Sequence, residues 1–244
     1  MALTAFILFG CVDNPTRPDA SQYEEAASIN LQLGMEYMQK GRFDLAEEKL
    51  LKAISLDDGI PEAHNALGVL YDEQGRPKRA EDEFRRALRL YPGFTTARLN
   101  LGALLCEQGQ TEEGEAQFTE ILKGNEENQQ RASAFEGIGL CRMAASDLVG
   151  AKENFEEALN LSPTLSKASL EMAVISLEEF KPLRARDFLQ RHHNSSSASA
   201  RSLLLGYEIE ADLGDRALQD SYGLRLRTEF PESKEAALLR SREQ

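Results

Sequence analysis

The residues of this chain that could do chemistry are few, because its 244 residues include only three cysteines and three histidines. No CxxC pair and no His near a Cys has the spacing of a zinc site. His192 and His193 precede the serines at 195–197 and are expected to form a solvated dipeptide in a polar loop. His64 is expected on a helix near the edge of the core, in a structural role. The chain also lacks a Gly-rich phosphate loop and a GxSxG motif, so we predict no catalytic residue, no metal site and no cofactor.

Two of the cysteines, Cys106 and Cys141, are 35 residues apart. We expect them to be small buried side chains in helices, because free cysteine is among the most buried residue types. A disulfide between them and a nucleophilic role are the alternatives.

Cys11 is the third cysteine, and it follows an apolar run at residues 3–10. Leu8-Phe9-Gly10-Cys11 resembles the bacterial lipobox, in which a small residue precedes the cysteine that is lipidated. We expect residues 1–10 to be a lipoprotein signal peptide, Cys11 to carry the lipid and residues 11–26 to form a polar tether. Acyl chains would then hold the protein on a membrane without spanning it. The alternative is an apolar N-terminus with an incidental cysteine.

The charge balance excludes several classes of partner. Lys and Arg number 28 against 41 Asp and Glu, a formal net charge of −13. Such a chain has no surplus of cations to displace counterions from DNA or RNA, and anionic membrane surfaces should repel it. Hydrophobic residues make up 41% of the chain, which is too many for a disordered acidic tail. We therefore expect a helical protein that binds neither nucleic acid nor a small-molecule substrate.

The elements that position these residues follow from an internal repeat of 34 residues. Its most complete copy contains Leu67-Gly68, Tyr71, Gly75 and Phe84. The pair that opens the motif recurs as Leu33-Gly34, Leu67-Gly68, Leu101-Gly102, Ile138-Gly139, Met172-Ala173 and Leu205-Gly206. The fourth copy comes 37 residues after the third, and we expect its three extra residues in the polar loop 124–130. The sixth copy is out of phase by about one residue in its turn.

This pattern resembles the tetratricopeptide repeat (TPR), a pair of amphipathic helices that cannot bury its apolar face alone. Glycines such as Gly41 and Gly75 are expected to end the first helix of a pair. Gly68 is expected to let the two helices approach closely, and Phe84 to fill the space beside it. We predict an all-α fold, a right-handed α-solenoid of about six TPR helix pairs over residues 27–232. The expected segments are repeats near 27–60, 61–94, 95–131, 132–165, 166–198 and 199–232, followed by a C-terminal tail at 233–244.

TPR arrays normally bind peptides or helices of other proteins in a groove lined by the first helix of each pair. Helical phasing assigns this groove a set of partly apolar residues: Leu31, Met35, Met38, Asn65, Val69, Leu99, Asn100 and Cys106. The groove turns acidic at Asp72 and Glu107 and carries no Lys or Arg, unlike TPR clamps that hold a C-terminal carboxylate. Leu31, Met35 and Met38 form an apolar stripe suited to a hydrophobic partner. The alternatives are that the stripe packs against residues 20–27 or is a loose cap of the solenoid.

The sixth copy narrows the resemblance to one family. The segments Ala200-Arg-Ser-Leu-Leu-Leu-Gly206 and Ser221-Tyr-Gly-Leu224, with the lipobox and six repeats, resemble the type IV pilus biogenesis and stability lipoproteins (PilW/PilF), the pilotins of the pilus secretin. Residues 168–173 and Ala185-Arg186 are also similar to that family. The resemblance implies a non-enzymatic outer-membrane lipoprotein, facing the periplasm, that binds the secretin subunit and supports its localisation and multimerisation. The alternative is a generic TPR adaptor or an envelope-assembly lipoprotein with a different client.

Overall fold

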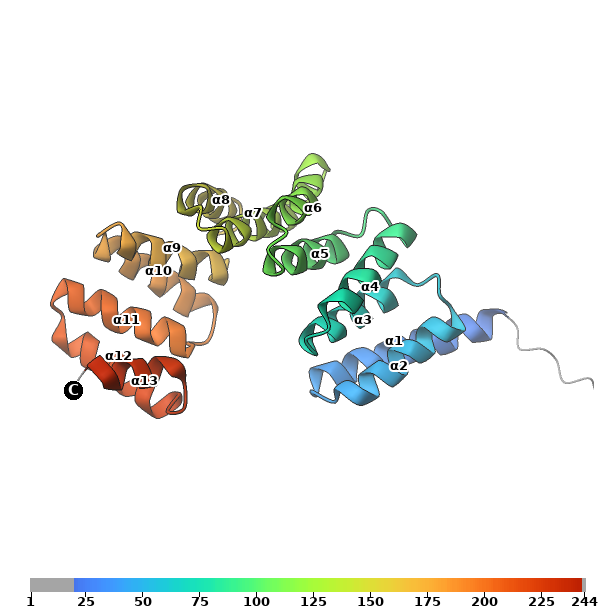
Figure 1. Cartoon of the computed structure of the whole chain (residues 1–244), viewed down its shortest axis with the longest axis horizontal. Coiled ribbons are helices and arrows are strands. Elements are labelled where there is room, and N and C mark those ends of the chain that lie inside the picture. The colour runs from blue at the N-terminus through green and yellow to red at the C-terminus, as the bar shows by residue number, and fades with distance from the viewer. Residues whose placement is uncertain (1–19, 243–244) are drawn as a thin grey trace, which may run out of the picture. The chain divides into compact units, whose positions relative to one another are not determined.

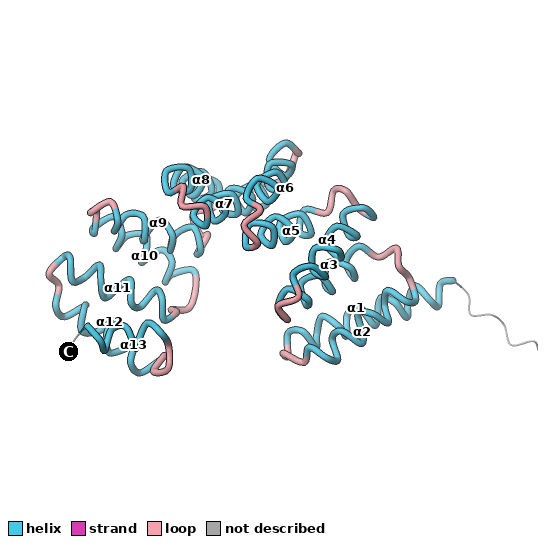
Figure 2. Tube along the Cα trace, in the orientation of Figure 1, coloured by secondary structure: helices cyan, strands magenta, loops and turns pink. Residues whose placement is uncertain are grey.

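The computed structural model describes residues 20–242. The expected signal peptide, the lipidated Cys11 and the tether up to residue 19 lie outside the described residues. The described part contains thirteen α-helices and no strand. Figure 2 shows the helices in cyan, joined by loops and turns in pink. The predicted all-α class is therefore confirmed. Within residues 20–242, no helix has the length and hydropathy that a membrane crossing requires.

The chain divides into two compact units, which we describe separately. The first unit ends at Pro92 and contains four helices: α1 (Ala20–Gln39), α2 (Phe43–Leu56), α3 (Pro61–Glu73) and α4 (Pro77–Leu90). The second unit begins at Gly93 and contains α5 (Thr95–Glu107), α6 (Thr111–Lys123), α7 (Asn128–Ala144), α8 (Leu148–Leu161), α9 (Ser166–Glu178), α10 (Pro182–Ser195), α11 (Ala200–Leu213), α12 (Arg216–Glu229) and α13 (Lys234–Arg242). Figure 1 labels these helices along the chain.

Consecutive helices pack as pairs, and within each unit a pair contacts the next pair of the same unit. In five of the six pairs, a glycine of the first helix lies against a large side chain of the second helix. A Cβ atom on Gly68 would lie 2.6 Å from Cε1 of Phe84, and one on Gly139 would lie 2.5 Å from the same atom of Phe155. The prediction that these aromatic rings fill the space beside the glycines is confirmed. The sixth pair uses the same contact, because Gly206 faces the ring of Tyr222.

The turns inside the pairs share one backbone conformation. Gly41, Gly75, Gly109 and Gly214 have φ between 66° and 77°, the left-handed region in which a helix commonly ends. The predicted glycine caps of the first three pairs are confirmed. The fourth and fifth pairs have Ser146 (φ 64°) and Phe180 (φ 58°) at this position. A bulky residue is uncommon in this region, because its Cβ crowds the backbone.

Cys106 of α5 and Cys141 of α7 form a disulfide, with their Cα atoms 5.2 Å apart. The expectation that they are separate buried thiols is wrong. Both side chains are buried, as expected, but α5 also packs against α7. This contact between the first helices of neighbouring pairs brings the two sulfur atoms together.

Two other elements differ from the sequence-based expectation. The three extra residues of the fourth repeat mostly lengthen a helix: α7 has 17 residues, whereas α5 and α9 have 13. The expected C-terminal tail contains a further helix, α13, which packs against α11 and α12. Ala236 and Leu239 of α13 are fully buried. The helix thus covers the apolar side of the last pair, which has no following repeat.

Two ion pairs join the fifth and sixth helix pairs, α9–α10 and α11–α12. Arg201 of α11 binds Glu171 of α9, with nitrogen to oxygen distances of 2.5 and 2.8 Å. Arg186 of α10 binds the buried carboxylate of Glu210 on α11. All four residues lie in or beside the segments on which the resemblance to the pilus lipoproteins depends. These segments therefore contribute contacts between repeats.

Candidate partner-binding site

The predicted apolar stripe lies on α1. Met35 is 47% exposed, and Leu31 and Met38 are half-buried. Ala27 and Gly34 are buried, so α1 packs through a different face, with Gly34 against Leu50 of α2. The stripe is thus an accessible surface of thioether and aliphatic side chains, which can adapt to an irregular apolar partner.

The helix α1 is continuous from Ala20 to Gln39. Residues 20–27 therefore belong to the same straight element as the stripe and cannot fold back over it. The alternative in which these residues cover the stripe is wrong. Within the described part of the first unit, only α2 and α3 contact α1.

The second set of predicted groove residues lies on α3, which packs against α4 and also contacts α1. Asn65 and Val69 are half-buried there. Asp72 follows one turn later, is exposed, and has a pKa raised by the partial burial of its carboxyl. Asn65 and Val69 thus lie on a helix that packs against the helix of the stripe. The carboxylate of Asp72 lies on the same helix, one turn after Val69.

The third set lies in the second unit. Leu99 and Asn100 are half-buried on α5, and Leu99 packs against the cluster that contains Cys106 and Phe118. Cys106 is 8% exposed and bonded to Cys141, so its prediction as a groove residue is wrong. The disulfide turns this position of α5 inward.

The histidines have structural contacts. Nδ1 of His64 lies 2.7 Å from Oε2 of Glu83, and its Nε2 lies 3.2 Å from the carbonyl oxygen of Asp58, so the expected structural role is confirmed. The prediction of a solvated dipeptide at 192–193 is wrong, because α10 extends to Ser195 and buries His192. Its Nδ1 lies 2.7 Å from Oγ of Ser166.

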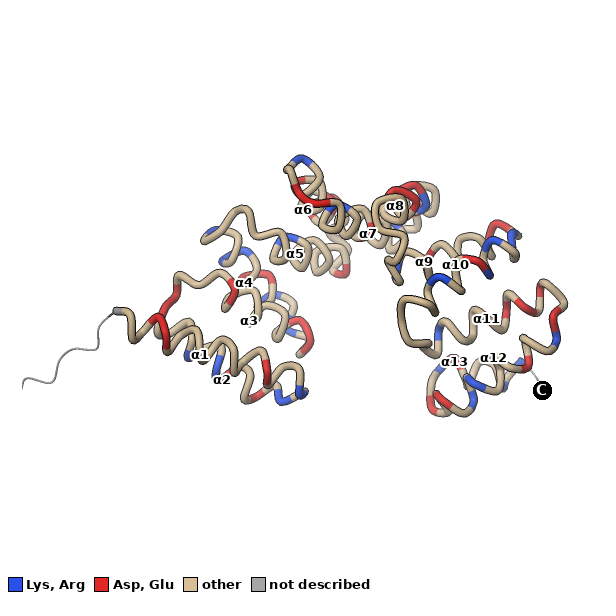
Figure 3. Tube along the Cα trace, turned by 180° about the vertical axis from the view of Figure 1, so that it is seen from behind, with Lys and Arg blue, Asp and Glu red and all other residues tan. Residues whose placement is uncertain are grey.

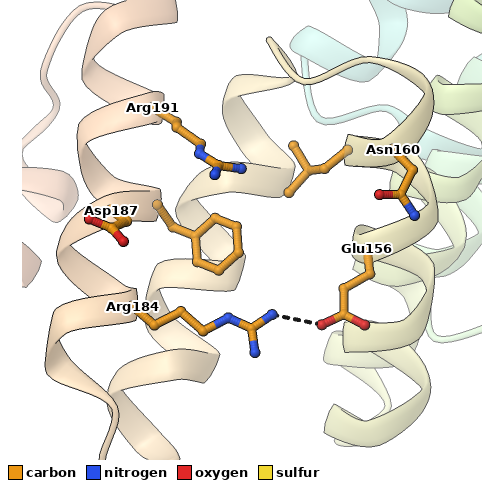
Figure 4. A pocket seen from close by; sticks show the side chains of 7 residues that line it. Glu156, Asn160, Arg184, Asp187 and Arg191 are labelled. Atoms are coloured by element: carbon orange, nitrogen blue, oxygen red, sulfur yellow. Dashed lines mark hydrogen bonds and ion pairs between the residues drawn. The ribbon is translucent and has the colours of Figure 1, made fainter.

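A polar pocket of about 470 Å³ lies between α8 and α10 in the second unit. Figure 4 shows Arg184, Asp187 and Arg191 of one helix facing Glu156 and Asn160 of the other. Arg184 donates to Glu156 over 2.9 Å. Arg184 and Arg191 both lie against the ring of Phe188, 5.4 and 5.2 Å from its centre. Two guanidinium groups beside one ring could bind the carboxylate of a ligand. The same pocket already contains two carboxylates, Glu156 and Asp187, so it has no surplus of positive charge.

Acidic and basic residues alternate along the helices of both units, as the red and blue segments of the backbone trace in Figure 3 show. Many form ion pairs between neighbouring helices, such as Arg142 with Glu115 at 3.0 Å and Arg76 with Glu47 at 3.1 Å. Among the described residues, no group of three His, Cys, Asp or Glu side chains could hold a metal ion.

The helix pairs, their glycine crossings and their turns define a class, the tetratricopeptide-repeat proteins. Two tetratricopeptide-repeat family models match the chain, at residues 31–93 and 71–135. The type IV pilus assembly protein PilF of Pseudomonas aeruginosa is 33% identical over 239 residues, which are 96% of this chain and 93% of PilF. The chain belongs to this PilF/PilW family of tetratricopeptide-repeat type IV pilus biogenesis proteins.

Solved structures agree with this assignment. A structure from a functional characterisation of Pseudomonas aeruginosa PilF is 31% identical, with a TM-score of 0.76 over 91% of this chain and 99% of that one. The crystal structure of PilW, a widely conserved type IV pilus biogenesis factor, is 23% identical with a TM-score of 0.74, over 87% of this chain and 97% of PilW. The PilW structure supports the fold.

The sequence analysis missed one group of exposed apolar residues in the second unit: Leu148, Val149, Phe180 and Leu183. All four lie in or just after the turns of the fourth and fifth pairs. An alignment of the six turns by the repeat would have revealed these residues. At most of the equivalent positions, the other repeats have glycine or a polar residue.

Proposed function

We propose that this chain is a non-enzymatic lipoprotein scaffold, a pilotin, which binds a subunit of the type IV pilus secretin and supports its localisation and multimerisation at the outer membrane. The observation that carries the proposal is the accessible apolar stripe of Leu31, Met35 and Met38 in a member of the PilF/PilW family. An extended or amphipathic segment of the secretin would bury its apolar side chains against this stripe. Asn65 and Val69 of α3 complete the proposed binding surface in the first unit.

The proposed mechanism is tethering. Acyl chains on Cys11 would anchor the protein to the periplasmic face of the outer membrane, and a bound secretin subunit would be concentrated there with its copies. The disulfide of Cys106 and Cys141 supports a location outside the cytosol, because disulfides persist in oxidising compartments such as the periplasm.

The binding surface is tested by Met35→Glu with Met38→Glu in the full chain. Two carboxylates on the stripe would have to be desolvated against an apolar partner, so secretin co-purification from envelope extracts should fall at least about tenfold. The matched control is Ile29→Glu with Leu51→Glu, which adds the same charge at exposed apolar positions of α1 and α2 outside the stripe. Circular dichroism should show equal helicity for both variants. Undiminished co-purification of the secretin with the stripe variant would remove the assignment.

The anchor has a separate test. Metabolic labelling with palmitate should label the wild-type chain and not Cys11→Ala. A labelled protein that co-purifies with another envelope protein in place of the secretin would point to an envelope-assembly lipoprotein with a different client. An unlabelled protein would point to a soluble adaptor.

A further inference from the structure

One carboxylate of the first unit, that of Asp72, lies on the helix face that continues the apolar stripe. The stripe residues follow the spacing i, i+4, i+7 along α1, which places them on one face of the helix. The same spacing recurs 34 residues later on α3, as Asn65, Val69 and Asp72. Asp72 is therefore on the face of α3 that is equivalent to the stripe.

The repeat sets the register between these two faces. The helices α1 and α3 are the first helices of successive pairs, and they contact each other. Equivalent positions of stacked repeats are neighbours, because each pair packs on the next in the same way. Val69 is thus the neighbour of Met35, and Asp72 is the neighbour of Met38. The surface has an apolar centre and a carboxylate at the end near the turns of the two pairs.

No cation of the chain compensates this carboxylate. Partial burial raises the pKa of Asp72, and no cation among residues 20–242 lowers it. Neither α1 nor α3 contains a Lys or Arg. The first cation after each helix is bound to another group: Lys40 pairs with Glu36 at 3.7 Å, and Arg76 pairs with Glu47 at 3.1 Å. The surface therefore has a negative charge without a partner at one end.

The fold gains nothing from this charge. Asp72 lies in the last turn of α3, where the negative end of the helix dipole disfavours an acidic side chain. The repeat does not require a carboxylate at this position either, because the equivalent residues of the first and third pairs are Met38 and Cys106. Residues that oppose stability are typical of functional surfaces. The charge of Asp72 thus points to a contact that forms on binding.

We infer that Asp72 determines specificity at the stripe by binding a Lys or Arg side chain of the partner, next to the apolar side chains that the stripe buries. The inference rests on the proposed capture of a secretin segment. The helical rise places Met38 about 4.5 Å beyond Met35 and about 10.5 Å beyond Leu31. An extended segment advances about 3.3 Å per residue, so its cation lies about one to three positions from its apolar residues.

The same chemistry disfavours other occupants. The carboxylate would repel an anionic membrane surface. A second copy that used the same surface would bring no cation, because α1 and α3 have none. Arg17 is the only Lys or Arg before Ala20. Its three-residue connection to α1 reaches about 10 Å, whereas α1 rises about 27 Å from Ala20 to Met38.

The test compares secretin co-purification from envelope extracts for variants of the full chain. Asp72→Lys should reduce it at least about tenfold and Asp72→Asn at least about threefold, whereas Asp72→Glu should stay within about twofold of the wild type. The matched controls are Asp82→Lys and Asp82→Asn, the same changes at an exposed position of α4, outside the proposed surface. Both controls should stay within about twofold of the wild type.

Two further measurements distinguish an ion pair from a structural role. Raising NaCl from about 50 to about 300 mM should weaken co-purification with the wild type more than with Asp72→Asn, because salt screens an exposed ion pair. The Tm of Asp72→Asn should equal or exceed that of the wild type, because the carboxylate opposes the helix dipole. Equal salt dependence, or a lower Tm of the variant, overturns the inference.

The cation of the partner is tested by photo-crosslinking with p-benzoylphenylalanine at position 73, beside Asp72. Mass spectrometry should place the crosslink in a secretin segment with a Lys or Arg within about three positions of apolar residues. A segment without such a cation overturns the inference, as does a crosslink to lipid or to a second copy of the chain.

The stripe variant separates this inference from the proposed function. If Met35→Glu with Met38→Glu loses the secretin while Asp72→Lys retains it, the inference about Asp72 is overturned and the proposed function stands. If both variants retain the secretin, the assignment of the stripe is overturned together with the inference.

Discussion

At the scale of single residues, Glu136 shows how one carboxylate links two helix pairs. Its Oε1 accepts a hydrogen bond of 2.9 Å from the backbone N–H of Ala168, at the start of α9. Burial raises the pKa of Glu136 above 4.5, and this bond offsets the rise only in part. The folded protein therefore disfavours the charged carboxylate that it uses to hold the next pair.

This raised pKa has a consequence for stability. Between the unfolded and folded pKa values the folded state binds more protons, so the wild-type chain loses stability as the pH rises through that window. Glu136→Gln keeps an acceptor for Ala168 and removes the charge. We expect its Tm to exceed that of the wild type at pH 7, and the difference to disappear near pH 4.

Thermal melts monitored by circular dichroism at both pH values measure this difference. Glu157→Gln, an exposed change on α8, is the matched control and should melt like the wild type. A Glu136→Gln variant that is less stable than the wild type at pH 7 would contradict the prediction.

At the scale of elements, the disulfide joins α5 and α7, the first helices of two successive pairs. Their connection runs through α6 and the loop before α7, and the bond closes this segment into a ring. A crosslink over a separation of 35 residues restricts the unfolded chain. It also holds the two pairs together where the repeat is irregular.

Removing the bond should therefore destabilise the second unit. Cys106→Ala with Cys141→Ala should lower the free energy of unfolding by about 2–4 kcal/mol. Urea titrations followed by circular dichroism measure this loss. Dithiothreitol should shift the midpoint of the wild type toward that of the variant and leave the variant unchanged. A wild-type midpoint that does not respond to the reductant would contradict the prediction.

At the scale of the whole molecule, both units carry exposed apolar side chains. The stripe on α1 is rich in methionine and is proposed for the secretin. In the second unit, Leu148, Val149, Phe180 and Leu183 lie in or just after the turns of the fourth and fifth pairs.

The stripe assignment predicts that an exposed apolar residue of the second unit is not needed for secretin capture. Phe180→Gly should keep secretin co-purification within about twofold of the wild type, because Phe180 lies outside the proposed binding surface. Parallel co-purifications with Met35→Glu plus Met38→Glu measure this, and a loss of the secretin with Phe180→Gly would contradict it.

Much of the fold could be predicted from the sequence, because a repeat imposes the same packing on every copy. Gly68 and Phe84 are 16 residues apart, as are Gly139 and Phe155. This spacing alone predicts that a ring fills the gap beside a glycine. The glycine turns and the face of α1 that carries Met35 follow from the same helical periodicity, and they need no knowledge of distant contacts.

The remaining features were decided by contacts between repeats, which periodicity does not encode. Cys106 and Cys141 are bonded because α5 packs against α7, although phasing within one helix assigns Cys106 to the groove. His192 is buried because α10 extends through a segment whose composition predicts a polar loop. The sequence by itself determined the repeat and its helices, and the tertiary structure decided which side chains of different repeats meet, since these contacts depend on how each pair packs on the next.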